Sequence, residues 1–403
     1  MERAAPTTGH ATVPDAIILD RDGLDALIAA LRGDGYAVIG PRVRDGAIVL
    51  DPVETADDLP WGLIDEQDGG RYRLMPGDAN TAFSHTAFSH TVGPQSWKRH
   101  LYPPRQTLWT GRRDGRGFTV ETPADPAPRH AFLGVRACDL AAMAVQDRVF
   151  GVAPHEGRSA GQERFTDSGY AARRAAAFIV AVNCGRAGGT CFCDSMGTGP
   201  KAAGGYDLAL TELPGTELPG RGAPAFLAEA GSAAGAALLA RLPGRVAGPE
   251  DRAAADAAVG NACAGMGRAM VPDAGPLLAR NLEHPRWAEV AARCLSCANC
   301  TMVCPTCFCT TVEDTTDLSG DHVERWRRWD SCFTVDFSYI HGGSLRQSGL
   351  SRYRQWMTHK LSSWWEQFGT SGCTGCGRCI TWCPVGIDIT EEARAIHDSE
   401  GRG

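Results

Sequence analysis

The sequence contains very little lysine and carries no excess of positive charge. Of its 40 basic residues only Lys98, Lys201 and Lys360 are lysines. The 47 acidic residues outnumber the basic ones and give a formal net charge of −7 over 403 residues. A chain of this charge lacks the positive field on which nucleic-acid binding depends. We therefore expect no nucleic-acid partner.

The sequence also lacks a long apolar run. The longest apolar stretches, such as residues 176–182, are much shorter than the roughly 20 residues that cross a bilayer. Residues 1–14 show neither the basic start nor the apolar centre of a secretory signal. We expect a cytoplasmic protein without membrane insertion, in a compartment that disfavours disulfides. The 16 cysteines then point to metal binding, because many of them are crowded at short spacings.

The order of short apolar runs and helical patterns predicts an α+β fold. A mixed α/β N-terminal domain is expected over residues 1–280, with buried strands at 36–39, 47–50, 118–120, 131–135 and 176–182. Helices are expected at 22–33, capped by Asp22, and at 140–149. The Ala, Gly and Pro-rich stretch at about 211–260 resembles an insertion. A mainly helical, ferredoxin-like dicluster domain is expected over residues 285–403, with an insert at 305–372.

Two complete ferredoxin motifs lie in this C-terminal part. They read Cys294-x2-Cys297-x2-Cys300-x3-Cys304-Pro305 and Cys373-x2-Cys376-x2-Cys379-x3-Cys383-Pro384. In such motifs three closely spaced thiolates bind one [4Fe-4S] cluster, while the fourth cysteine binds the other cluster. One cluster is therefore predicted on Cys294, Cys297, Cys300 and Cys383. The other is predicted on Cys373, Cys376, Cys379 and Cys304.

Zinc is the alternative occupant, but it prefers four tetrahedral ligands supplied as two separated pairs. Two full copies of the longer motif favour iron–sulfur clusters. Pro305 and Pro384 fix the fourth cysteines, and Gly375 and Gly377 would allow backbone N–H groups to approach cluster sulfur.

A further group of cysteines precedes this region. Cys138 ends one expected strand, and Cys184, Cys191 and Cys193 follow another in a glycine-rich loop. These four could bind a third iron–sulfur cluster, or they could be buried thiols without a metal. A phosphate-binding loop is less well supported, because Pro200 interrupts the dinucleotide pattern and no Gly-Lys-Ser/Thr sequence occurs.

The insert carries three more cysteines and an amphipathic pattern. Cys307, Cys309 and Cys332 could compete as cluster ligands, since Cys-Phe-Cys occurs at both 191–193 and 307–309. Apolar residues recur every three or four positions over 353–368, which predicts a helix facing a core rather than a partner.

These motifs lie within longer segments that resemble one family. The segments are TVGPQSWKRHLYPP at 91–104, VRACDLAAMAVQDRVF at 135–150, NCGRAGGTCFCDSMGTGP at 183–200, CLSCANCTMVCPTCFC at 294–309, WDSCFTVDFSYIHGG at 329–343, and the stretch from 351 to 392. Together they resemble the iron–sulfur β subunit of soluble sulfhydrogenases, which are NAD(P)-linked nickel–iron hydrogenases. A related protein is the corresponding iron–sulfur subunit of anaerobic sulfite reductase.

The resemblance implies an electron-transfer subunit that is not an enzyme on its own. Its expected partners are the small and large hydrogenase subunits and an FAD- and NAD(P)-binding subunit. The alternative is the equivalent subunit of an anaerobic sulfite reductase, whose partner carries sirohaem. A stand-alone iron–sulfur reductase and a redox sensor are further alternatives, although paired clusters favour conduction over sensing.

Overall fold

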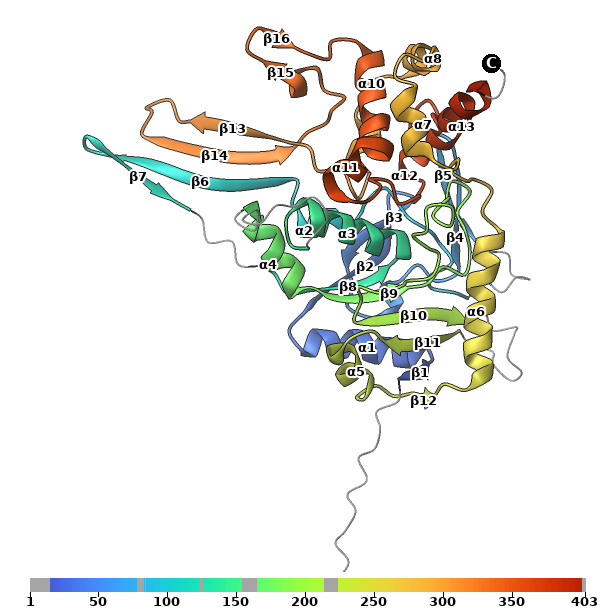
Figure 1. Cartoon of the computed structure of the whole chain (residues 1–403). Coiled ribbons are helices and arrows are strands. Elements are labelled where there is room, and N and C mark those ends of the chain that lie inside the picture. Colours follow the sequence, from blue (N-terminus) through green and yellow to red (C-terminus); the bar gives the residue numbers. More distant parts are fainter. Residues whose placement is uncertain are drawn as a thin grey trace, which may run out of the picture.

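The computed structural model describes residues 15–400 except 78–82, 84, 123–126, 154–164 and 214–223. Its N-terminal part is built on a mixed eight-stranded sheet (Figure 1). The four neighbouring strands β10, β9, β8 and β2 are parallel, and the outer pairs are antiparallel. In spatial order the strands are β12 (Arg245–Val246), β1 (Ala16–Leu19), β11 (Ala225–Ala230), β10 (Leu208–Leu213), β9 (Phe178–Val182), β8 (His130–Val135), β2 (Ala37–Arg44) and β3 (Ala47–Pro52).

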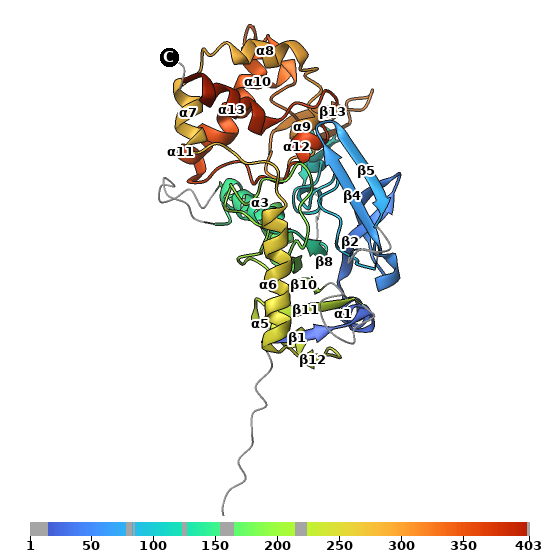
Figure 2. The same cartoon turned by 90° about the vertical axis from the view of Figure 1, so that its right-hand side faces the viewer.

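Helices cover both faces of this sheet, because successive residues of a strand point to opposite sides. In β9, Val180 packs on the core shared with α1 (Arg21–Gly33), whereas Ile179 packs on the core shared with α3 (Ala137–Val149). The remaining helices of this part are η1 (Ala56–Asp58), α2 (Lys98–Leu101), α4 (Ser168–Ala176), α5 (Ala233–Leu239) and α6 (Pro249–Ala264). Figure 2 shows α6 running upright along one side of the sheet.

Two details differ from the sequence-based expectations. The cap of α1 is Asp20, whose carboxylate accepts a 2.8 Å hydrogen bond from the Gly23 N–H, whereas Asp22 lies inside the first turn. The stretch expected to be an insertion supplies β11, which is paired on both sides by β1 and β10. Because this stretch is rich in alanine, its sequence did not indicate a buried strand. Residues 214–223 of the stretch lie outside the described residues.

A second, four-stranded antiparallel sheet projects from the body of the molecule (Figure 1). Its order is β13 (Thr310–Thr316), β14 (His322–Trp329), β6 (Arg105–Asp114) and β7 (Gly117–Glu121). The expected strand at 118–120 is thus present, but it is an exposed edge strand rather than a buried one. Small two-stranded sheets are formed by β4 (Leu63–Asp68) with β5 (Arg71–Pro76) and by β15 (Tyr339–Ile340) with β16 (Gly343–Ser344).

The C-terminal part is mainly helical and has its own apolar core. The helix predicted at 353–368 is continuous, but its α-helical geometry is interrupted by a π-helical turn at His359–Ser363. Its apolar side chains, such as Trp356 and Leu361, are buried in that core. The elements are α7 (Ala274–Arg280), α8 (Arg286–Arg293), α9 (Asn299–Met302), η3 (Val335–Ser338), α10 (Gly349–Thr358), the π-helical turn η4 (His359–Ser363), α11 (Trp364–Phe368), α12 (Arg378–Thr381) and α13 (Ile389–Glu400).

The predicted fold class is confirmed: a mixed α/β N-terminal region precedes a largely helical region that carries the two ferredoxin motifs. In the part of the chain that the structure describes, no helix combines the length and the hydrophobicity needed to cross a bilayer.

Candidate metal centres

The first thiol set gathers around a small apolar cavity in the C-terminal core. Cys383 is the fourth cysteine of the second motif, yet it lies with the cysteines of the first motif. Phe333, Tyr353 and Trp356 line the same cavity. Cys379 also lines this cavity. The first thiol set consists of Cys294, Cys297, Cys300 and Cys383.

The second thiol set shows the reciprocal exchange. Cys304 belongs to the first motif but lies within electrostatic range of Cys373, Cys376 and Cys379. Cys379 is also a neighbour of Cys300, so the two sets are adjacent. The structure thus brings both predicted groups of four together, and the second thiol set consists of Cys304, Cys373, Cys376 and Cys379.

The two motifs have the same local geometry. In each, the third cysteine lies on a one-turn helix, α9 or α12, entered through a residue with positive φ. That residue is Ala298 at φ 66° in the first motif and Gly377 at φ 77° in the second. The buried Pro305 and the exposed Pro384 follow the fourth cysteines, and Pro384 lines the cavity of the first thiol set.

Gly375 and Gly377 have a second role that the sequence did not indicate. A Cβ on Gly377 would lie 2.4 Å from the carbonyl oxygen of Thr190, and one on Gly375 would lie 2.6 Å from the Cα of Cys193. The Phe192 N–H donates a 2.9 Å hydrogen bond to the Gly375 carbonyl. The absent side chains therefore let the second ferredoxin motif contact the cysteine loop of the N-terminal part.

The third thiol set lies at this contact. Cys138, at the start of α3, packs with Cys193 and Cys376 in one buried apolar cluster. Cys191 and Cys193 both lie near Cys184, whose sulfur is 3.8 Å from the Arg136 guanidinium. All four predicted members converge, and the third thiol set consists of Cys138, Cys184, Cys191 and Cys193.

A buried ion pair joins the third set to the second. Arg378, between Cys376 and Cys379, donates to both carboxylate oxygens of Asp139 at 2.8 and 3.0 Å. Their side chains are only 2% and 3% exposed. Asp139 follows Cys138, so this pair fixes the distance between the N-terminal and C-terminal cysteine groups.

The chemistry of these thiol sets fits iron–sulfur clusters better than zinc. Zinc prefers ligands supplied as two separated pairs, whereas each of these sets takes three closely spaced cysteines from one motif and a fourth from another segment, or four cysteines from two loops. A [4Fe-4S] cluster needs a wider arrangement, because each thiolate binds a different iron. Burial raises the pKa of Cys138, Cys300 and Cys379 well above the usual value for a thiol, so a bound cation is needed to hold them as thiolates.

Comparison with known proteins agrees with this geometry. Residues 293–387 match the protein family described as the 4Fe-4S dicluster domain. The C-terminal region contains a 4Fe-4S dicluster domain. Over 309 residues the chain is also 29% identical to sulfhydrogenase 2 subunit beta of Pyrococcus furiosus, a match covering 74% of this chain and 84% of that protein. The predicted resemblance to sulfhydrogenase β subunits is confirmed.

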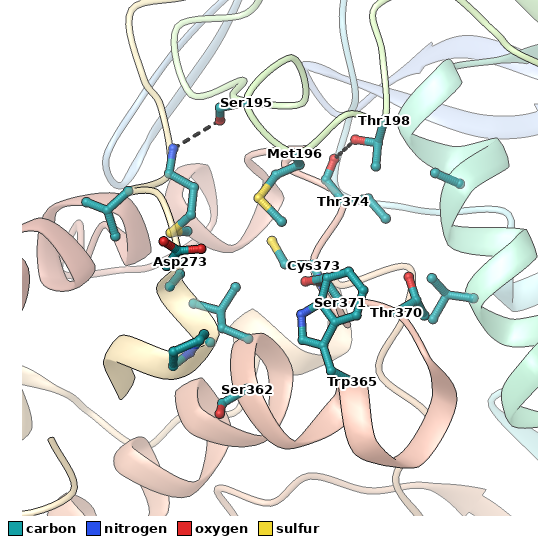
Figure 3. Close-up of a pocket in the computed structure, with 18 of the residues that line it drawn as sticks. Ser195, Met196, Thr198, Asp273, Ser362, Trp365, Thr370, Ser371, Cys373 and Thr374 are labelled. Carbon is teal, nitrogen blue, oxygen red and sulfur yellow. Dashed lines mark hydrogen bonds between the residues drawn. The ribbon is translucent and has the colours of Figure 1, made fainter. Parts of the chain in front are cut away.

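The dicluster domain borders a cleft of about 1070 Å³ (Figure 3). Cys373 of the second thiol set lies in its wall, together with Met196 and the half-exposed Trp365. The Thr198 hydroxyl donates to the Thr374 carbonyl at 2.7 Å, which holds the 195–198 loop against the dicluster domain. Cys373 is itself buried, so the cleft ends close to the second thiol set without exposing it.

Four of the 16 cysteines remain, and three of them, all except Cys263, form a separate group. Cys307 contacts Cys304, and Cys309 contacts Cys332. Lys360 lies near all three cysteines of this group, and Lys98 lies near Cys307 and Cys309. The sequence singled out these cysteines but not the two lysines, which lie 262 positions apart by number and meet only in the fold.

Proposed function

We propose that this chain is the iron–sulfur electron-transfer subunit of a cytoplasmic nickel–iron hydrogenase complex. It connects an FAD- and NAD(P)-binding subunit to the small and large hydrogenase subunits and performs no bond chemistry alone. The first, second and third thiol sets each hold one [4Fe-4S] cluster. The dicluster domain and the similarity to a sulfhydrogenase subunit support the coarser part of this proposal.

The observation that carries the proposal is the continuity of the three thiol sets. Cys376 of the second set packs against Cys138 and Cys193 of the third. Cys379 of the second set neighbours Cys300 of the first. Cys297, in the first set, is exposed. A series that begins in the N-terminal part and reaches the surface of the dicluster domain suits conduction between two partners.

Iron–sulfur clusters supply one-electron chemistry over a wide range of reduction potentials. The residues around them hold and insulate the sites. Aromatic side chains line one side of the first thiol set, and the guanidinium groups of Arg136 and Arg378 place positive charge beside the third and second sets. Such surrounding charge and hydrogen bonding tune a cluster's potential.

Affinity purification of the tagged chain under anaerobic conditions tests the partners. We expect nickel and flavin to copurify with the chain at about one equivalent each. Sirohaem in place of nickel would instead assign the chain to an anaerobic sulfite reductase. Recovery of the chain alone from cells that make all the subunits would contradict the role of a subunit.

Variants of the isolated complex test conduction. Cys376→Ser alters the cysteine between the second and third thiol sets, so it should abolish NAD(P)H-linked hydrogen turnover. Hydrogen turnover with an artificial redox dye should be retained, because the dye exchanges electrons with the catalytic subunits directly. Cys263→Ser is the control, because this half-buried thiol on α6 belongs to no thiol set. Equal losses of both activities in Cys376→Ser would contradict conduction through this chain.

A further inference from the structure

We propose that Cys307, Cys309 and Cys332 hold an additional iron–sulfur cluster beside the second thiol set, with Lys98 and Lys360 supplying positive charge to it. We call these three cysteines the fourth thiol set. The inference extends the proposed electron-transfer function, which requires only the first three sets.

The first argument is an internal sequence repeat with a shared structure. Thr-Cys-Phe-Cys occurs at 190–193, where it supplies two thiols to the third set, and again at 306–309. Both threonines are buried against the second ferredoxin motif: Thr190 is hydrogen-bonded to the Thr381 hydroxyl at 2.7 Å, and Thr306 donates to the Gly372 carbonyl at 2.6 Å.

The phenylalanines of the two copies also act alike. Phe192 is fully buried, and Phe308 packs edge-on against Trp364 with ring centroids 5.5 Å apart. In an extended segment, alternate residues point to the same side. When the phenylalanine points into a core, the two cysteines that flank it therefore both point to the opposite side. Both copies therefore present a pair of thiols.

The β13–β14 hairpin brings the third cysteine to the second copy. Thr310 pairs with Trp329, and the Asp330 N–H donates a 2.8 Å hydrogen bond to the Cys309 carbonyl. The chain then turns so that the Cys332 thiol contacts the Cys309 thiol, and Cys309 also neighbours Cys307.

The second argument is the charge placed around these thiols. Lys98 and Lys360 are only 4% and 3% exposed. The Lys98 ammonium donates to the Cys307 carbonyl at 3.0 Å, and that of Lys360 lies 3.3 Å from the Cys304 sulfur. Among the described residues, the charged neighbours of both lysines are cysteines and each other, not carboxylates.

Buried ammonium groups without an anion are costly. Cys304, Cys307 and Cys309 all lie near both lysines, so thiolates at Cys307 and Cys309 would add negative charge at the same place as Cys304. A thiolate-bound cluster between the two lysines supplies the missing negative charge. Two of the three lysines in the sequence occupy this one place, while arginine supplies nearly all other positive charge. A disulfide between Cys309 and Cys332 would use two of the three thiols but would leave both lysines without that anion.

Iron and sulfide analysis of the anaerobically purified full chain tests the inference. Three [4Fe-4S] clusters account for about twelve irons, and a further cluster on three thiolates raises the count to about fifteen or sixteen. We expect Cys332→Ser and Cys309→Ser each to lose about three to four irons while keeping the EPR signals of the dicluster domain. Cys263→Ser is the matched control and should retain every iron.

Cys184→Ser separates this inference from the proposed function, because it should remove only the third cluster. Loss of iron in Cys184→Ser without loss in Cys332→Ser overturns the fourth site and leaves the third. The reverse result supports the fourth site and contradicts the third.

Wild-type protein provides a measurement that does not depend on variants folding. The chain is denatured under argon in iodoacetamide and digested for mass spectrometry. Complete alkylation of Cys307, Cys309 and Cys332, together with about fifteen irons, supports the cluster. A Cys309–Cys332 disulfide peptide, or a count of twelve irons or fewer, overturns it.

Discussion

Removing the guanidinium of Arg378 should greatly destabilise the contact between the N-terminal part and the dicluster domain. Arg378→Met leaves the Asp139 carboxylate buried at 3% exposure and without its two hydrogen bonds. Breaking a buried pair from one side costs about 3–5 kcal/mol. The Gly93 carbonyl also loses its 3.1 Å hydrogen bond, which adds about 1 kcal/mol. We therefore expect a loss of about 4–6 kcal/mol in the free energy of unfolding.

Anaerobic urea unfolding followed by tryptophan fluorescence measures this loss. With a slope of about 3 kcal/mol per molar urea, the midpoint should fall by roughly 1–2 M. Iron content, measured on the same samples, separates loss of a cluster from loss of the ion pair. Arg280→Met is the control, because its pair with Glu400 is largely exposed and solvent-screened and should contribute little to stability.

The double variant Arg378→Met/Asp139→Leu tests the cause. Removing both charges avoids a lone buried carboxylate, so most of the lost stability should return. A single variant that loses less than about 1 kcal/mol, or a double variant as unstable as the single one, would refute the reasoning.

Three other outcomes are expected. Cys304→Ser should damage the cluster of Cys373 rather than that of its own motif, and low-temperature EPR showing the opposite loss would contradict the exchange. The isolated chain should not bind NAD(P), since the sequence offers no pyrophosphate-binding turn; micromolar binding by calorimetry would disprove this. Burial raises the pKa of Glu212 to about 7 despite hydrogen bonds from the Ala87 and Phe88 N–H groups. Because the folded-state pKa of Glu212 lies above the unfolded value of about 4.5, the protonated carboxyl stabilises the folded state. This contribution, up to about 3 kcal/mol, is complete below about pH 4.5 and is lost as the pH rises through 7. Glu212→Gln should flatten that dependence in urea midpoints at pH 5 and 8, and an unchanged slope would exclude Glu212 as its source.

Local patterns allowed much of the fold and of the cysteine groups to be predicted. The strands near 36–50 and 131–135 are short apolar runs bounded by turn residues, and the ferredoxin motifs specify which cysteines meet because their spacing is short. The strand β11 was not predicted, because alanine and the flanking glycine and proline favour a loop or helix when read locally. Its place between β1 and β10 depends on partners far away in the sequence.

The buried charges could not be predicted for the same reason. Nothing near Arg378 in the sequence indicates Asp139, which lies 239 residues away. The scarcity of lysine is visible in the composition, but composition does not indicate where the three lysines lie. Only the fold shows that Lys98 and Lys360 share one environment.

The pairing of β6 with β14 has a consequence for synthesis of the chain on the ribosome. The β6–β7 hairpin is complete at Glu121, but the strand that covers its other edge begins only at His322. While the intervening residues are made, the nascent protein exposes an unpaired strand edge that can associate with other chains. A fragment ending near residue 285 would keep that edge permanently, so expression of the N-terminal half alone should give aggregated protein, and adding the β13–β14 segment should restore solubility.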